Sequence, residues 1–293
     1  MIQSFAEEMK AILKEDENSI LILMGIGRYI FRESKEDSPQ RVMDIGIMEP
    51  AAMGIAAGMA AKGLIPFLYT WAPFLVERAY EQLKLDFGCQ NLGGNFIGAG
   101  ASYDLAAFGD SHYCPSDVPI LKQIRNMQIV VPGTADEFAA LFRAAYNNGC
   151  PTYYRLSDRV NDKSNAVEFG KAAVLRKGAR ATVIVAGPML HDILPIAEDY
   201  DVTVLYYTTI APFDREALRE NIAGNRVMIV EPYNKGVILE EVVEALPGYS
   251  LKIETIGFET NSVCNLGEYS ENISDWGFDK DTVKLKLERL LEE

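Results

Sequence analysis

Short apolar runs alternate with amphipathic segments along the whole chain. Runs such as residues 64–70 and 181–187 are typical of strands buried on both faces. Segments with apolar residues three and four apart, such as 2–14 and 135–149, predict helices that pack one face on a core. This order of strands and helices favours a parallel sheet covered by helices on both faces. The other predicted strands are 19–27, 42–47, 95–100, 128–133, 152–156, 202–208, 226–232 and 251–258, and the other predicted helices are 50–63, 73–88, 191–200, 215–224, 235–248 and 281–293.

A polar stretch interrupts this alternation. Residues 157–180 carry many charged side chains and no long apolar run, which is typical of a connection between domains. A chain of 293 residues is also long enough to bury two cores. We therefore predict an α/β fold of two domains, each a mostly parallel sheet with helices on both faces. The first domain is predicted at 1–160, the linker at 161–175 and the second domain at 176–293.

Composition and charge limit the partners of the protein. The net charge of −14 repels nucleic acid and anionic membrane surfaces. No apolar run reaches the roughly 18 to 20 residues of a membrane span, and the N-terminal residues lack the apolar core of a signal peptide. We therefore expect a cytoplasmic protein. The four cysteines form no CxxC pair, which favours reduced, structural thiols; they are Cys89, Cys114, Cys150 and Cys264.

One acidic residue stands at a predicted strand-to-helix junction. Glu49 follows the predicted strand 42–47 and precedes Pro50, and most of the residues after it are small or apolar. Ligands of open parallel sheets gather at the carboxyl ends of the strands. Two interpretations of Glu49 remain open at this point. It is either a carboxylate that favours the positive end of the helix dipole, or a partly desolvated carboxylate that holds or shares a proton.

Two further stretches lie at the same predicted edge. Trp71 and Phe74 follow the strand 64–70, and such aromatics either fill the core or stack on a flat heterocycle. The long, glycine-rich loop 98–119 carries His112, and loops of this length in α/β domains are often functional. An acid and a histidine brought together from these segments are suited to proton transfer.

Common phosphate and metal motifs are missing from the sequence. It has no P-loop, no GxGxxG after a strand and no HExxH, and it lacks the GDG…N motif that holds a metal and a diphosphate. We therefore predict no metal-binding residues in this chain. The other histidine, His191, begins a predicted helix and is interpreted as a polar or capping residue.

Taken together, several segments resemble one family. GIMEPAAMGIAAGMAAKGLIPFLYTWAPFLVERAYEQLKLD resembles the start of the pyrimidine-binding domain of transketolase-type thiamine diphosphate enzymes. GDSHYCPSDVPILKQIRNMQIVVPGTADEF and TYYRLSDR resemble later parts of that domain. GKAAVLRKGARATVIVAGPM, TTIAPFD and VMIVEP resemble the C-terminal transketolase domain. Nearly the whole chain is therefore similar to the C-terminal half of a transketolase, encoded as a separate subunit.

The resemblance implies roles for particular residues. Glu49 corresponds to the glutamate that hydrogen-bonds N1′ of the aminopyrimidine ring and so promotes removal of the thiazolium proton. Trp71, Phe74 and Glu77 are implied as cofactor-binding residues around that ring. His112 corresponds to the loop histidine that contacts substrate hydroxyls or relays protons, so Glu49 and His112 are the implied catalytic pair.

The sequence departs from transketolases at the implied substrate site. Tyr103-Asp104 stands where transketolases carry a His-Asp pair, and the loop before His112 is shorter. Asp158 stands where the family has an arginine for a sugar phosphate, with Arg159 one place further on. The implied substrate-binding residues are therefore Tyr103, Asp104, His112 and Arg159, and these departures leave open a donor or acceptor other than a sugar phosphate.

The absence of GDG…N agrees with the resemblance, because in this family that motif belongs to the N-terminal half. The resemblance thus implies an N-terminal partner subunit that holds the diphosphate and Mg²⁺ of thiamine diphosphate, in a two-plus-two heterotetramer. The implied activity is transfer of a two-carbon ketol unit between sugars. The alternatives are a pyruvate-using relative, such as a 2-oxoacid dehydrogenase β subunit or a deoxyxylulose-phosphate-synthase-like enzyme, and a non-catalytic scaffolding subunit.

Overall fold

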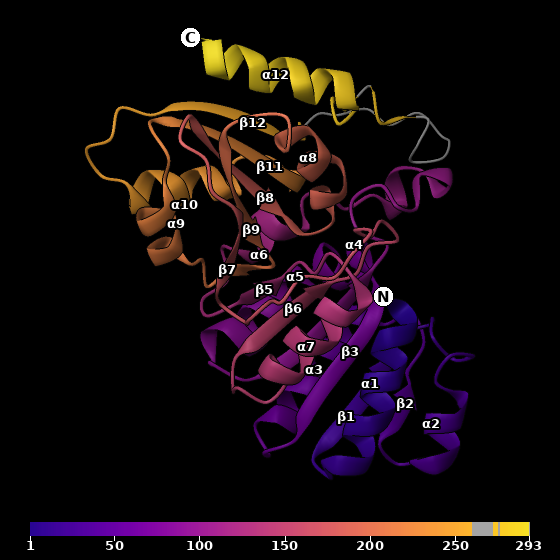
Figure 1. Cartoon of the computed structure of the whole chain (residues 1–293). Helices are drawn as coiled ribbons and strands as arrows, with labels where there is room; N and C mark the ends of the chain where they lie inside the picture. The colour runs from indigo at the N-terminus through magenta and orange to yellow at the C-terminus, as the bar shows by residue number, and fades with distance from the viewer. Residues whose placement is uncertain (260–271, 275, 293) are drawn as a thin grey trace.

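The computed structural model describes residues 1–259, 272–274 and 276–292. Its strands form two sheets, one of seven strands and one of five. Figure 1 shows the first sheet in the lower, indigo-to-magenta part of the molecule and the second sheet in the upper, orange part. The predicted α/β class with mostly parallel sheets is confirmed.

The first sheet has the strand order β10-β5-β6-β4-β3-β1-β2. All its neighbouring strands are parallel except β10, which pairs antiparallel with β5. Because β10 follows β9 of the other sheet, the chain returns to complete the first sheet. The strands are β1 (Ser19–Leu23), β2 (Val42–Asp44), β3 (Ile65–Trp71), β4 (Gly94–Ala99), β5 (Gln128–Val130), β6 (Pro151–Arg155) and β10 (Thr209–Ala211).

Helices cover both faces of this sheet. One face packs against α1 and α7, which contribute aromatic rings, among them Phe5 of α1 and Phe138 and Phe142 of α7. The opposite face is covered by α3 and α4, whose side chains join a second core cluster. The helices of this part are α1 (Ile2–Glu15), α2 (Arg32–Asp37), α3 (Glu49–Ala60), α4 (Ala72–Val76), α5 (Tyr80–Gln82), a π-helix (Leu83–Cys89), 3₁₀ turns (Ala106–Phe108 and Asp110–His112), α6 (Asp117–Leu121) and α7 (Ala135–Ala145).

The second sheet has the order β12-β11-β8-β9-β7, with β7 antiparallel to β9 and the other pairs parallel. In Figure 1, α12 lies over β12 at the top of the molecule. The elements are β7 (Ala172–Arg176), β8 (Ala181–Ala186), β9 (Val202–Tyr207), β11 (Arg226–Asn234), β12 (Lys252–Phe258), a 3₁₀ turn (Gly187–Met189), α8 (Leu190–Ala197), α9 (Arg215–Asn221), α10 (Val237–Ala245) and α12 (Lys280–Glu292).

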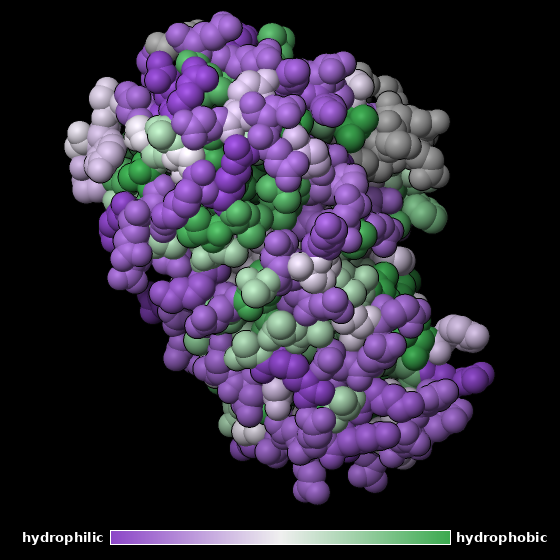
Figure 2. All heavy atoms as spheres, in the orientation of Figure 1, coloured by the Kyte–Doolittle hydropathy of each residue, from purple (hydrophilic) through white to green (hydrophobic). Residues whose placement is uncertain are grey.

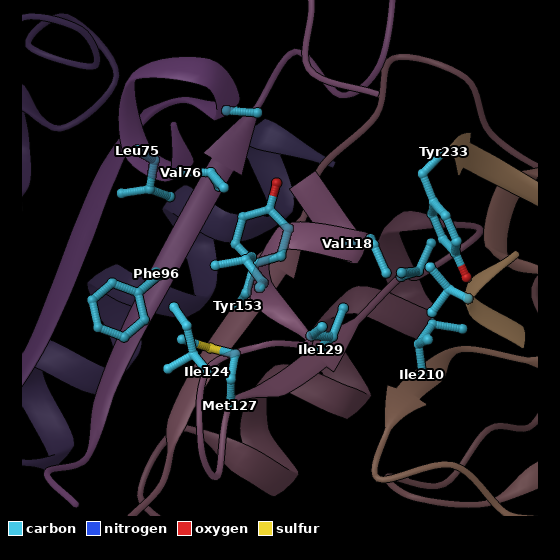
Figure 3. Packing of buried hydrophobic residues seen from close by; sticks show 14 of the residues in the cluster. Leu75, Val76, Phe96, Val118, Ile124, Met127, Ile129, Tyr153, Ile210 and Tyr233 are labelled. Carbon is cyan, nitrogen blue, oxygen red and sulfur yellow. The ribbon is translucent and has the colours of Figure 1, made fainter. Parts of the chain in front are cut away.

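One core cluster runs between the two sheets. In Figure 3, Leu75 of α4 and Phe96 of β4 lie at one end, and Ile210 of β10 and Tyr233 of β11 lie at the other. Val118, on α6, lies between them and close to Tyr233. The two sheets are therefore joined by apolar packing as well as by the chain.

One predicted helix needs correction in detail. The predicted helix 73–88 is broken: α4 ends at Val76, a turn follows, and the chain continues as α5 and the π-helix. Apolar spacing continues across the break, so the pattern does not reveal it. Most of β7 lies within the predicted linker 161–175. The domain limits themselves stay a prediction.

Hydrophilic and hydrophobic residues occupy different parts of the surface. Figure 2 shows a mostly hydrophilic lower end, where α1, β1 and α2 lie, and hydrophobic residues across the middle of the same face.

The thiols of Cys89, Cys114 and Cys150 are free, whereas Cys264 lies outside the described residues. Within the described part of the chain, no helix is both long and apolar enough to cross a bilayer.

Candidate active site

A tight turn after β2 brings Glu49 to the edge of the first sheet. The Asp44 side chain accepts a hydrogen bond from the backbone N–H of Gly46 at 2.9 Å. Gly46 has φ +76°, a conformation that side chains with a Cβ rarely adopt. Pro50 then sits in the first turn of α3, where its fixed φ suits a helix start. Glu49 is thus the first residue of α3, just beyond the carboxyl end of β2.

The Glu49 carboxylate is buried, with only 1% of the residue exposed. Its Oε2 accepts a hydrogen bond from Nη1 of Arg78 at 2.9 Å, and the Arg78 side chain is 41% exposed. No described residue donates to its Oε1. A buried carboxylate oxygen without a donor is costly and rare in native structures. Glu49 therefore has an open acceptor position that a ligand could fill.

Aromatic contacts connect Arg78 to the histidine of the long loop. The Arg78 guanidinium lies 4.0 Å from the centre of the Phe74 ring. The Phe74 ring in turn packs edge-on against His112, with 5.1 Å between ring centres. The exposed ring of Phe108 covers His112 from another side, also at 5.1 Å. The structure thus brings Glu49, Phe74 and His112 together through Arg78.

Internal contacts hold the loop that presents His112. Gly109 has φ +78°, which turns the chain between the two 3₁₀ turns. The backbone N–H of Cys114 donates to the Ser102 carbonyl and closes the loop at its base. Next to His112, the Ser111 hydroxyl lies 2.9 Å from Nδ1. The histidine is therefore carried by a structured segment.

The predicted substrate residues other than His112 contact different parts of the fold. Tyr103 is 3% exposed and stacks on Trp276, with 4.7 Å between ring centres. The Asp104 carboxylate accepts hydrogen bonds from the Ser157 hydroxyl and the Asp158 N–H, and burial raises its pKa to about 6. The Arg159 guanidinium forms an ion pair with Asp192. Their role in binding substrate stays a prediction.

The remaining predicted cofactor residues, Trp71 and Glu77, occupy different surroundings. Trp71 packs with the cluster on the α1 and α7 face of the sheet. Glu77 lies in the turn after α4 and accepts a hydrogen bond from the Ser116 hydroxyl at 2.5 Å. It borders an open groove of about 480 Å³ together with Tyr80 and α6. Their part in cofactor binding also stays a prediction.

Sequence reasoning missed two arginines. Arg78 lies four residues after Phe74. Side chains four apart are neighbours on a helix, so this spacing could have predicted that Arg78 lies next to the Phe74 ring. Arg155 is 2% exposed, forms an ion pair with the buried Asp117 at 2.7 Å, and donates to the Pro232 carbonyl of β11. Arg155 thus joins the two sheets. Within the described part of the chain, no group of three or more His, Cys, Asp or Glu residues is suited to hold a metal ion.

Comparison with known families decides how the Glu49 group is interpreted. The family described as "Transketolase, pyrimidine binding domain" matches residues 1–160, which is more than half of the chain. The chain belongs to the transketolase family. Glu49, Phe74, Arg78 and His112 all lie in the matched part of this transketolase-family protein.

Individual relatives include whole enzymes and separate subunits. One subunit of the apulose-4-phosphate transketolase of Actinobacillus succinogenes is 27% identical over 263 residues, which cover 85% of this chain and 84% of that protein. The 1-deoxy-D-xylulose-5-phosphate synthase of Clostridium perfringens is 32% identical over 274 residues, which cover 87% of this chain and 44% of that protein. The chain therefore spans less than half the length of that synthase.

A solved structure supports the fold. The structure titled "Split gene transketolase, inactive beta4 tetramer" superposes with a TM-score of 0.87 at 23% identity, and the match covers 99% of this chain and 97% of that chain. At this identity the similarity shows that the two chains share a fold.

Proposed function

We propose that this chain is the C-terminal subunit of a thiamine diphosphate-dependent, transketolase-like enzyme. In this proposal it transfers a two-carbon ketol unit between sugar or sugar-phosphate substrates, together with an N-terminal partner subunit. The observation that carries the proposal is the buried Glu49 carboxylate, whose Oε1 has no donor among the described residues. Such an oxygen fits the protonated ring nitrogen of an aminopyrimidine.

The surroundings of Glu49 suit the pyrimidine end of the cofactor. Glu49 and Phe74 offer an acceptor and an aromatic face, and Trp71 and Glu77 are the further cofactor residues that the family resemblance implies. When bound, thiamine diphosphate supplies a nucleophilic carbon that attacks a ketose carbonyl and carries the two-carbon unit. Glu49 holds a proton at the ring nitrogen in an apolar setting, where a charge-assisted hydrogen bond is strong.

His112 is the proposed second catalytic residue. Three contacts in a row connect it to Glu49: Phe74 packs against His112, Arg78 lies over the Phe74 ring, and Arg78 pairs with Glu49. An imidazole ring can both donate and accept a hydrogen bond, which suits contact with the hydroxyl groups of a sugar. Tyr103, Asp104 and Arg159 complete the proposed substrate residues.

The partner subunit supplies what this chain lacks. The sequence has no GDG…N motif, so the diphosphate and Mg²⁺ are assigned to the partner. Apolar side chains are exposed around α3, next to Glu49, and are suited to a subunit interface. A relative whose name describes it as one subunit of a transketolase supports the idea of a separate partner. We propose a two-plus-two heterotetramer. The exposed residues are Ile47, Met48, Ile55 and Leu85.

A second candidate function uses pyruvate as the donor. It is favoured by the 32% identity to a 1-deoxy-D-xylulose-5-phosphate synthase and by Tyr103, which replaces the histidine of transketolases. The enzyme reconstituted with its partner separates the two candidates when hydroxypyruvate and pyruvate are offered as donors. We expect turnover of hydroxypyruvate; turnover of pyruvate alone would favour the second candidate.

Calorimetry tests the division of labour between the subunits. The isolated chain, titrated with thiamine diphosphate and Mg²⁺, should show no tight binding, whereas the reconstituted complex should bind the cofactor. Tight binding by the isolated chain would contradict the proposed role of the partner.

A further inference from the structure

Arg78 occupies an unusual place in the fold. It lies in the turn between α4 and α5, where the predicted long helix is broken. Its guanidinium touches two groups, the Phe74 ring of α4 at 4.0 Å and Glu49 Oε2 of α3 at 2.9 Å. The flat face of a guanidinium can stack on an aromatic ring while its N–H groups at the edge donate hydrogen bonds. The Phe74 ring thus fixes the position of the Arg78 guanidinium, and the guanidinium in turn fixes the Glu49 carboxylate.

The contact with Glu49 uses one carboxylate oxygen. Nη1 of Arg78 donates to Oε2, and Oε1 is left without a donor among the described residues. A carboxylate with one oxygen fixed loses its freedom to rotate, so the direction of the other oxygen is also fixed. The positive charge of Arg78 also offsets part of the cost of burying the Glu49 carboxylate.

We propose that Arg78 is a positioning residue that orients the Glu49 carboxylate so that Oε1 faces the cofactor. This inference rests on the proposed function, because it assumes that Glu49 Oε1 accepts a hydrogen bond from thiamine diphosphate. Arg78 acts through Glu49 in this arrangement. The Phe74 ring fixes the plane of the guanidinium, and the half-exposed position of Arg78 keeps the cost of burying its charge low.

A double-mutant cycle on cofactor binding tests the inference. The dissociation constant of thiamine diphosphate is measured by calorimetry on the complex with the partner, for wild type, R78M, E49Q and the double variant. We expect R78M to weaken binding about tenfold in the wild-type background, or about 1.4 kcal/mol. In the E49Q background the same change should weaken binding less than about twofold, because residues in contact are not additive.

Two further variants guard against general disruption. R78K keeps a charge and one donor, so it should lose less affinity than R78M. R143M removes an arginine that pairs with Glu8 and Glu15 on the opposite face of the sheet, and should leave the dissociation constant unchanged. Melting temperature and complex size, measured for every variant, report whether the fold and assembly are intact.

The possible outcomes separate this inference from the proposed function. If E49Q leaves cofactor affinity unchanged, the proposed role of Glu49 fails. If E49Q weakens binding but R78M does not, or if the two effects add, the positioning role of Arg78 is wrong and the proposed function stands. If R78M raises only the KM for the donor sugar, Arg78 contacts substrate, and the inference is again overturned.

Discussion

Glu49 and Glu231 are both buried glutamates. Glu49 follows β2 of the first sheet, and Glu231 lies in β11 of the second sheet, directly after Val230, which pairs with β8 and β12. Glu231 is fully buried, and its two oxygens accept hydrogen bonds from the backbone N–H groups of Gly236 and Ile238 at 2.7 and 2.8 Å. These N–H groups belong to the start of α10, so Glu231 caps that helix. Glu49 lies at the start of α3, but it has one oxygen on Arg78 and the other without a described donor.

The difference separates a structural carboxylate from a candidate catalytic one. The fold itself supplies a backbone N–H donor to each carboxylate oxygen of Glu231, so neither oxygen needs a ligand as its donor. Burial raises the pKa of Glu231 to about 7, although the backbone N–H groups act in the opposite direction. Burial alone is therefore a poor indicator of function, and the hydrogen bonds that are missing carry more information.

The largest expected effect is the loss of activity in E49Q. Glutamine keeps the shape and an acceptor for Arg78, but it lacks the charge that stabilises a proton on the cofactor ring. We expect turnover of the reconstituted enzyme to fall about a thousandfold. The free energy of unfolding should stay within about 1 kcal/mol of wild type, because the half-exposed guanidinium remains solvated. Steady-state kinetics and urea unfolding measure the two quantities.

E231Q is the variant matched to E49Q, and it should lower stability while leaving turnover nearly unchanged. An amide NH₂ group faces one of the two backbone N–H groups and leaves a buried donor unpaired, at a cost of about 2 kcal/mol in unfolding free energy at pH 5. Turnover per folded molecule should stay within about twofold of wild type. A thousandfold loss of turnover in E231Q, with normal stability, would contradict the comparison.

The pH dependence of stability sharpens the same contrast. The pKa of Glu231 is about 7 in the folded protein and ordinarily 4.5, so the native state binds this proton more tightly than the unfolded chain. Its stabilising contribution is full below about pH 4.5 and is lost as the pH rises through about 7. The stability advantage of wild type over E231Q should therefore fall from about 2 kcal/mol at pH 5 to near zero at pH 8.

Glu240 supplies the control for this measurement. It lies on α10, the helix that Glu231 caps, but it is exposed and pairs with Lys122, which holds the pKa of its carboxyl below the ordinary value. The difference between wild type and E240Q should stay nearly constant from pH 5 to 8. A difference between wild type and E231Q that is equally constant would mean that Glu231 does not titrate in this range.

The sequence allowed the sheet class and part of the site to be predicted. Glu49, Phe74 and His112 were identified because strand ends of a parallel sheet meet at one edge. Arg78 was missed, because the helix pattern continues across the break at which it lies. The burial of Tyr103 against Trp276 depends on contacts more than 150 residues apart in the chain, and no local pattern encodes them.

The smallest expected effect concerns two exposed helix faces, that of α3 beside the first sheet and that of α10 beside the second. Ile55 on α3 is 44% exposed beside the exposed Gly54 and Gly58, whereas Val243 on α10 is 56% exposed. If α3 forms the subunit interface, I55S should weaken assembly about tenfold, since burying an isoleucine stabilises by about 1.5–3 kcal/mol and part of Ile55 is already covered. V243S should leave assembly unchanged. Sedimentation equilibrium of the complex measures both, and equal effects of the two substitutions would mean that the apolar face of α3 has no special part in assembly.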